Sequence, residues 1–367
     1  MKYVYFREFP DTFTTGIDKP NSTIGVINSV QIEVPMASLQ TQYMGLNLKN
    51  PLIVSSSGIT GSVNGVRKCE ESGAGAVVLK SMFEELIIAK SEDLDHDLIQ
   101  SEHPEAYEYI RAELGMQLGP HSYLKFIGDV RSAVSLPVIA SVNCITPKWW
   151  VPYAKDIESS GADGLELNIS HFPLGKGETS SDIEKRYADI VHAVTSQVTI
   201  PVAVKVGFYF TSLVGVLEKL VAAGARALVL FNRYYTVDVD LKKRCFVPAM
   251  TLSSPVEMNM PLRWTGLLAG KLDCDIAAST GIHDSEGIIK MLFAGATAVQ
   301  LCSTLYSNGP LYLSVLVDEL NAWLDREGFS SVNDIRGLAL RCEEDREVLL
   351  KRLQYIRAIE ESQKYEL

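Results

Sequence analysis

The chain has 367 residues, 47% hydrophobic and 22% charged, a composition that excludes disordered, collagen-like and disulfide-scaffold proteins. Its 34 Lys+Arg against 45 Asp+Glu give a formal net charge of −11, which disfavours a nucleic-acid partner because the surface repels phosphate backbones. Six cysteines without metal-ligand spacing indicate reduced thiols. With neither a secretory signal nor a membrane-spanning stretch in the sequence, we expect a soluble cytoplasmic protein.

The two ends of the chain lie outside the main pattern. Residues 1–40 are predicted to be an N-terminal extension. Residues 41–51 predict a small hairpin, with its turn within residues 46–49, that closes the bottom of a barrel. Residues 332–367 are rich in charge and predict a C-terminal helical tail packed on the outside.

A short phrase occurs four times, in which a small residue, Gly and Ala precede an apolar run: at 72–80, 160–168, 223–231 and 294–302. Each follows apolar residues at helical spacing, and Gly is the residue type that ends a helix in the left-handed conformation. Further apolar runs begin after Pro or Asp. Together these runs predict eight strands: 52–56, 76–80, 138–143, 164–168, 202–206, 227–231, 275–279 and 297–302.

Eight strands separated by helix-like segments predict an α/β protein, a closed (β/α)8 TIM barrel over residues 41–331. A doubly wound open sheet is the structural alternative, but the glycine motif of a dinucleotide site is not present. Insertions follow strands two and six, at residues 86–135 and 233–264. Both begin at the carboxyl end of a strand, where barrel enzymes build their sites, and both are therefore predicted to be substrate lids.

Polar residues follow the predicted strands, and Lys or Asn stands at five of the eight ends, which is costly unless these groups are paired or bind a ligand. Small residues after strands seven and eight are typical of a barrel phosphate site, because backbone N–H groups can reach an anion there. The candidates are Ser57, Gly58, Lys80, Ser81, Asn143, Asn168, His171, Lys205, Asn232, Ser279, Thr280, Gly281, Cys302 and Ser303.

Lysines and amides around a phosphate slot, without an acidic metal cluster, favour a phosphorylated planar cofactor such as a flavin. A lysine beside a flavin stabilises negative charge on the reduced ring, and Asn side chains match pyrimidine-like edges with a donor and an acceptor. The rival chemistry is a Schiff-base lyase in which Lys205 or Lys80 is the nucleophile.

An ordered set of segments carries a family resemblance: SSSGITG (55–61), AVVLKS (76–81), PVIASVN (137–143), GLELNIS (164–170), PVAVKV (201–206) and AGATAVQLCSTLYSNGP (294–310). The set resembles the dihydroorotate dehydrogenase family of FMN-dependent barrels. The resemblance implies that Lys80 and Ser81 contact flavin and substrate. It implies that six residues contact the flavin ring and ribityl chain: Ser57, Gly58, Asn143, Asn168, Lys205 and Asn232. It implies that Gly281, Cys302 and Ser303 contact the flavin phosphate.

The substrate side of the chain departs from that family. The family continues LNLSCPN after strand four, where Cys or Ser is the base that removes the C5 proton of dihydroorotate. This chain has LNISHFP, which puts His171 at the base position and Pro173 where a substrate-binding Asn is expected. Histidine is able to act as a base because its unperturbed pKa is about 6.5, and the alternative is that His171 is only a loop residue or a lid contact. The family's substrate loop is replaced by residues 113–120, and its Gly-Gly phosphate loop is not evident in 251–266.

The implied function is oxidation of dihydroorotate to orotate in pyrimidine biosynthesis, with His171, Lys80 and Ser81 as catalytic residues and FMN as cofactor. Alternatives are a flavin enzyme of the same family acting on another dihydropyrimidine or an enone, the Schiff-base lyase, and a non-catalytic flavin-binding barrel. The chain has no four-cysteine motif for an iron–sulfur centre, so such a centre would belong to an electron-transfer partner. A homodimer is expected by analogy only, and no membrane partner is expected.

Overall fold

The structure is a computed structural model that describes residues 36–84, 120–144, 150–171, 177–233, 236–249 and 252–341. All of them belong to one compact unit, and residues 1–35 lie outside the described ranges. Residues 1–35 of the predicted N-terminal extension, most of the insertion after strand two and the tail beyond residue 341 therefore lie outside the described residues. Within the described ranges, no helix is both long and apolar enough to cross a membrane.

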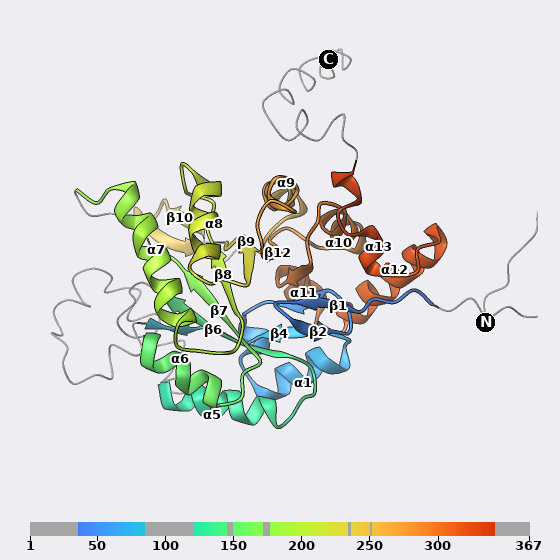
Figure 1. The fold of residues 1–367 in the computed structure, drawn as a ribbon, viewed down its shortest axis with the longest axis horizontal. Helices are drawn as coiled ribbons and strands as arrows, with labels where there is room; N and C mark the ends of the chain where they lie inside the picture. The colour runs from blue at the N-terminus through green and yellow to red at the C-terminus, as the bar shows by residue number, and fades with distance from the viewer. Residues whose placement is uncertain are drawn as a thin grey trace, which may run out of the picture. The chain divides into compact units, whose positions relative to one another are not determined.

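Eight parallel strands of the described chain close into a barrel, which confirms the predicted (β/α)8 fold (Figure 1). Each strand pairs with its neighbour along the chain, and the ring closes because β13 pairs with β3. The strands are β3 (Leu52–Val54), β4 (Ala76–Val78), β6 (Val138–Cys144), β7 (Gly164–Ile169), β8 (Val202–Val206), β9 (Ala227–Leu230), β12 (Asp275–Ser279) and β13 (Ala298–Leu301).

Every predicted strand overlaps an observed one, and the larger differences lie at the carboxyl ends. The strand predicted at 52–56 stops at Val54, and the one at 76–80 stops at Val78. A two-residue strand, β5 (Met82–Phe83), then resumes the pairing with β6. Polar residues follow these early stops at the carboxyl end of the barrel, called the mouth below, where Ser56 and Ser81 hydrogen-bond to each other.

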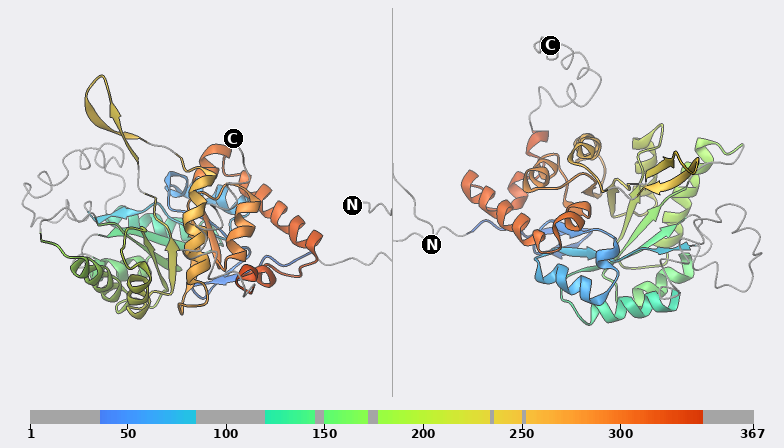
Figure 2. Two further views of the ribbon diagram at one scale, coloured as in Figure 1. Left: turned by 90° about the horizontal axis from the view of Figure 1, so that it is seen from above. Right: turned by 180° about the vertical axis from the view of Figure 1, so that it is seen from behind.

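Helices separate the strands and surround the barrel (Figures 1 and 2). The crossover helix α8 buries Leu213, Val216, Leu217 and Leu220, the helical spacing that the sequence predicts. The helices are α1 (Val63–Glu71), α5 (Pro120–Arg131), α6 (Trp150–Ser159), α7 (Ser180–Thr195), α8 (Leu213–Ala222), α9 (Asn259–Leu268), α10 (Ser285–Phe293), α11 (Ser303–Asn308), α12 (Tyr312–Glu327) and α13 (Val332–Ile335). Short 3-10 turns occur at η1 (Gly58–Thr60), η2 (Pro255–Met258) and η3 (Leu338–Leu340).

A hairpin of β1 (Thr41–Tyr43) and β2 (Leu46–Leu48) closes the amino-terminal end of the barrel, as predicted. Its turn is at Met44–Gly45, with φ of 55° and 81°, so the predicted turn within residues 46–49 was wrong. Gly45 adopts the left-handed conformation that a tight hairpin turn needs. Tyr43, Met44 and Leu48 are buried against the inward side chains of the strands, so the hairpin plugs this end of the barrel. Leu48 is therefore part of this plug and not of the turn.

The insertion after β9 contains a second hairpin, formed by β10 (Thr236–Asp240) and β11 (Cys245–Ala249). Figure 2 shows it projecting away from the barrel strands. It carries exposed apolar side chains, Val237, Leu241 and Phe246 among them. The segment predicted as a polar lid therefore contains a regular hairpin, and its role as a lid stays a prediction.

Candidate active site

The inside of the barrel changes from apolar to polar along the strand direction. Alternate residues of each strand point inward. Next to the plugging hairpin they are aliphatic, such as Ala203, Val229 and Ala277. Toward the carboxyl ends buried polar residues take over: Ser55, Ser81, Ser141, Glu166, Lys205, Ser279 and Gln300. The polar half of the interior is therefore at the end where barrel enzymes build their sites.

Lys205, on β8, is the centre of a network that joins four strands. Its side chain is buried, and its Nζ donates hydrogen bonds to Ser55 Oγ (3.1 Å) and Gln300 Oε1 (3.0 Å). The Gln300 Nε2 donates in turn to Glu166, whose other carboxylate oxygen lies 3.9 Å from Lys205 Nζ. The Lys205 Nζ is thus held by two hydrogen-bond acceptors, with one carboxylate nearby.

Ser81 is fixed by two neighbouring serines. Its Oγ lies 2.7 Å from Ser141 Oγ and 2.9 Å from Ser56 Oγ, and its backbone N–H donates to Ser56 Oγ. The preceding residue, Lys80, is half-buried and packs against Gly61, where an added Cβ would lie 3.1 Å from Lys80 Cδ. Lys80 and Ser81 therefore both lie at the carboxyl end of the barrel, where neighbouring residues hold them in place.

Three candidates stand side by side on adjacent strands. Asn143 of β6 pairs with Asn168 of β7, which pairs with Lys205 of β8. The Oδ1 of Asn168 is buried and has no hydrogen-bond partner among the described residues. A buried acceptor left unsatisfied costs about 1–3 kcal/mol, so such atoms indicate where a ligand binds. Asn232 follows β9, and its backbone N–H is bound to the carbonyl of Val206 (2.8 Å).

The end of β12 has unusual backbone geometry. Thr280 and Gly281 both have positive φ, of 82° and 77°. An added Cβ at Gly281 would lie 2.2 Å from the backbone nitrogen of Met258, so only glycine fits. Ser303 follows Cys302 and accepts a hydrogen bond from the backbone N–H of Ser253 (3.0 Å). Burial raises the pKa of the Cys302 thiol.

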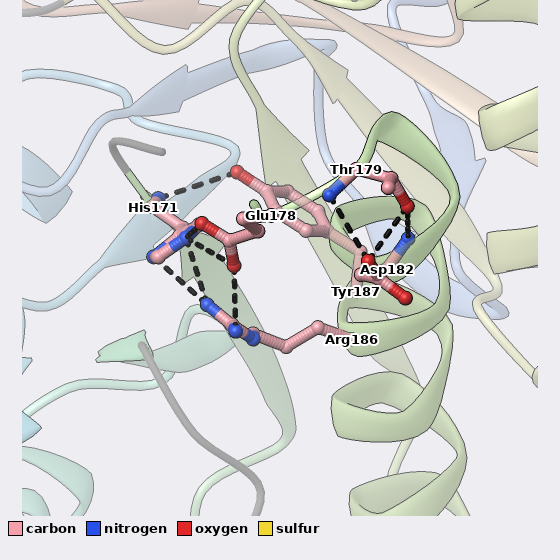
Figure 3. Close-up of polar contacts among 6 residues, drawn as sticks. All are labelled: His171, Glu178, Thr179, Asp182, Arg186 and Tyr187. Atoms are coloured by element: carbon pink, nitrogen blue, oxygen red, sulfur yellow. Dashed lines mark hydrogen bonds and ion pairs between the residues drawn. The ribbon is translucent and has the colours of Figure 1, made fainter. Parts of the chain in front are cut away.

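His171 lies in a separate cluster on the outer side of the β7 loop, against helix α7 (Figure 3). Its Nε2 is 3.1 Å from each Glu178 oxygen, and the Arg186 guanidinium is 2.7 Å from Nε2 and 3.2 Å from Nδ1. Arg186 also pairs with Glu178 at 2.7 Å. The hydrogen bond from His171, and then the charges of His171 and Arg186, lower the pKa of Glu178.

The start of α7 holds this cluster in place. Thr179 and Asp182 form a capping box, in which the Asp182 N–H donates to Thr179 Oγ1 and the Thr179 N–H donates to Asp182. The cap orders the residue directly after Glu178, and the backbone N–H of His171 donates to Tyr187 Oη of the same helix (3.3 Å). The described contacts of the His171 ring are therefore with α7 and its loop, not with Lys80 or Ser81.

Sequence reasoning missed several buried residues of the site. Glu166 and Gln300 lie inside runs that look purely apolar, two positions before Asn168 and Cys302. Counting back by two from each strand end would have found them, because that spacing keeps the side chain on the inner face. Arg233 was also missed. It follows Asn232 and forms an ion pair with Glu257 (2.7 Å) beside Gly281.

Comparison with known proteins agrees with this fold. The family profile described as dihydroorotate dehydrogenase matches residues 113–324, more than half of the chain. A protein of Aeropyrum pernix named "Putative dihydroorotate dehydrogenase A (fumarate)" is 32% identical over 309 residues, covering 83% of this chain and 98% of that protein. A protein of Thermoplasma acidophilum named "Dihydroorotate dehydrogenase B (NAD(+)), catalytic subunit" is 28% identical over 317 residues, covering 83% and 100%. The chain therefore belongs to the dihydroorotate dehydrogenase family.

Proposed function

We propose that this chain is an FMN-dependent oxidoreductase that oxidises dihydroorotate to orotate, a step of pyrimidine biosynthesis. The observation that carries the proposal is the mouth itself, where Asn143, Asn168 and Lys205 stand on adjacent strands and the Asn168 Oδ1 is buried without a partner in the described chain. The names of the relatives from Aeropyrum and Thermoplasma support the same reaction.

The residues at the mouth fit FMN. Asn side chains offer the donor and acceptor that a pyrimidine-like ring edge requires, and the Lys205 ammonium suits the part of the ring that gains negative charge. The flavin, when bound, supplies a hydride acceptor. The residues that would hold the ring and its ribityl chain are Ser57, Gly58, Lys80, Asn143, Asn168, Lys205 and Asn232. Those that would hold the phosphate are Ser279, Thr280, Gly281, Cys302 and Ser303.

Lys80 and Ser81 would contact the substrate, and His171 would accept its C5 proton. The Glu178 carboxylate supports this role by its position, since an acceptor 3.1 Å from Nε2 orients the imidazole. Arg186 opposes it, because its guanidinium lies against both ring nitrogens. The base role therefore requires that a ring nitrogen leave Arg186 when substrate binds.

Two alternatives differ in their support. The Schiff-base lyase is disfavoured, because its nucleophile must reach the substrate and the buried Lys205 Nζ is already bound to Ser55 Oγ and Gln300 Oε1. A flavin enzyme for another dihydropyrimidine is supported by Pro173 and His171, which replace the family's substrate-binding Asn and its base. Cytoplasmic location, a homodimer, and an acceptor that is fumarate or an electron-transfer partner belong to the same proposal.

The test is the visible spectrum of the purified chain, followed by anaerobic addition of dihydroorotate. We expect a bound flavin that bleaches with dihydroorotate and not with dihydrouracil. A colourless preparation that does not bind added FMN would contradict the cofactor. Bleaching by dihydrouracil alone would support the alternative dihydropyrimidine, and a lysine adduct trapped by borohydride in a colourless protein would support the lyase.

A further inference from the structure

A buried carboxylate lies beside Lys205, and the proposed chemistry leaves it without a role. Glu166 is only 1% exposed. One of its oxygens accepts a hydrogen bond from Gln300 Nε2, whereas Oε1 has no hydrogen-bond partner in the described ranges and lies 3.9 Å from Lys205 Nζ. A charge buried this deeply persists only when an opposite charge compensates it. Lys205 is therefore the compensating group.

Gln300 connects the two charges and is oriented by both. Its amide nitrogen faces Glu166, and its amide oxygen accepts hydrogen bonds from Lys205 Nζ (3.0 Å) and Ser55 Oγ (3.1 Å). Because the amide is planar, turning it over would point its N–H groups at the ammonium and its oxygen at the carboxylate. Glu166 thereby orients the Gln300 amide, whose oxygen accepts the hydrogen bond from Lys205.

We propose that Glu166 is a positioning residue for Lys205 and a counter-charge that offsets part of the positive charge Lys205 presents to the flavin. This inference rests on the proposed function, since it takes Lys205 as a flavin-binding residue. Reduction adds negative charge to the flavin, which a nearby cation stabilises and a nearby anion destabilises. Glu166 therefore holds the reduction potential of bound FMN below the value that Lys205 alone would set.

The first test is the midpoint potential of bound FMN, measured by dye equilibration. Glu166→Gln keeps an acceptor for Gln300 and removes the charge, so we expect a shift to a more positive potential. Lys205→Met should shift it to a more negative potential, and the double variant should lie between the two. No shift, or a negative shift, in Glu166→Gln would overturn the inference.

A matched control is Asp275→Asn, which removes a carboxylate from the opposite end of the same barrel. Asp275 accepts hydrogen bonds from the Met44 N–H (2.7 Å) and the Thr297 hydroxyl (3.0 Å) and takes no part in the Lys205 network. We expect a much smaller shift of potential from this variant. A shift equal to that of Glu166→Gln would mean that any carboxylate in the barrel has this effect, and the inference would be wrong.

The second test uses the chain without FMN, so that it remains decisive where flavin binding fails. Lys205→Met leaves Glu166 buried without its ion pair and should lower the thermal unfolding temperature. Adding Glu166→Gln to that variant should restore most of the loss. A double variant no more stable than Lys205→Met would overturn the pairing. Failure of the wild-type chain to bind FMN, with the restoration observed, would instead contradict the proposed function.

Discussion

His171 is the residue where base catalysis and a purely structural role make different predictions. As the base, it contributes by proton transfer, which is worth roughly 10²–10⁴-fold in rate. His171→Ala should slow anaerobic flavin reduction by dihydroorotate by that order and leave the affinity for FMN unchanged, as measured by stopped-flow absorbance and by flavin titration. The matched control is His192→Ala, an exposed histidine in the last turn of α7, which should leave the rate unchanged.

An unchanged reduction rate in His171→Ala would reject the base role. The cluster would then have a structural role, in which the ion pair of Glu178 and Arg186 holds the loop to α7 and the imidazole packs against that pair.

At this scale, the sequence predicted residues that end strands and missed residues within them. Asn143, Asn168 and Lys205 were found because polar side chains directly after apolar runs need a partner. The contacts of His171 could not be predicted, because Glu178 and Arg186 reach it from 7 and 15 positions away along the chain. No spacing rule links a loop residue to the helix that packs behind it.

At the scale of the elements, the loops that precede β6 and β8 are each held by a glutamate of a neighbouring helix. Glu158 of α6 accepts hydrogen bonds from the Thr199 N–H (2.8 Å), the Thr199 hydroxyl (2.6 Å) and the Ile200 N–H (3.1 Å). Glu70 of α1 accepts the corresponding three bonds from Ser135 and Leu136. Each loop enters its strand through a proline, so a helix carboxylate sets the start of β6 and of β8.

Glu158→Gln should therefore destabilise the chain in a way that depends on pH. The hydrogen bond from the Thr199 hydroxyl, followed by the backbone bonds, lowers the pKa of Glu158 below its ordinary 4.5. A carboxyl with a lowered pKa in the folded state contributes stability above its ordinary pKa, and that contribution is lost as the pH falls through the lowered value. We expect a loss of about 1 kcal/mol at neutral pH that fades in acid.

Urea unfolding of Glu158→Gln at several pH values measures this difference. The control is Glu71→Gln, an exposed residue at the end of α1, which should change stability little at any pH. A loss for Glu158→Gln that stayed constant into acid would mean that the carboxylate charge is not involved.

The strands of the barrel were predictable as elements, and the hairpin of β10 and β11 was not. Barrel strands are buried on both faces and give uninterrupted apolar runs. Thr236–Asp240 alternates Val with Asp and exposes both valines, and Cys245–Ala249 contains Pro248, so neither shows the pattern of a buried strand.

For the whole molecule, eight repeated strand–helix units were enough to predict a closed barrel, but not what fills it. Closure brings Ser55, Glu166, Lys205 and Gln300 together from four strands that span most of the chain. The sequence gives no distance between such residues until the order and register of the ring are known. The hydrogen bonds among these four residues were therefore visible only in the structure.

The last prediction concerns the plug that completes the barrel. Tyr43 is fully buried among the inward side chains, and its hydroxyl has no hydrogen-bond partner in the described chain. Burial, followed by the negative charge of Glu166, raises its pKa, so the phenol stays neutral. Tyr43→Ala should lower the free energy of unfolding by about 3–5 kcal/mol because it opens a cavity at the barrel end.

Tyr43→Phe keeps the ring and removes the unsatisfied hydroxyl, so it should leave stability unchanged or raise it slightly. Urea unfolding, followed by circular dichroism and by tryptophan fluorescence, compares both variants with wild type. If the plug is part of the cooperative unit, both signals should shift together in Tyr43→Ala. A Tyr43→Ala chain as stable as wild type would mean that the barrel holds itself closed without the hairpin.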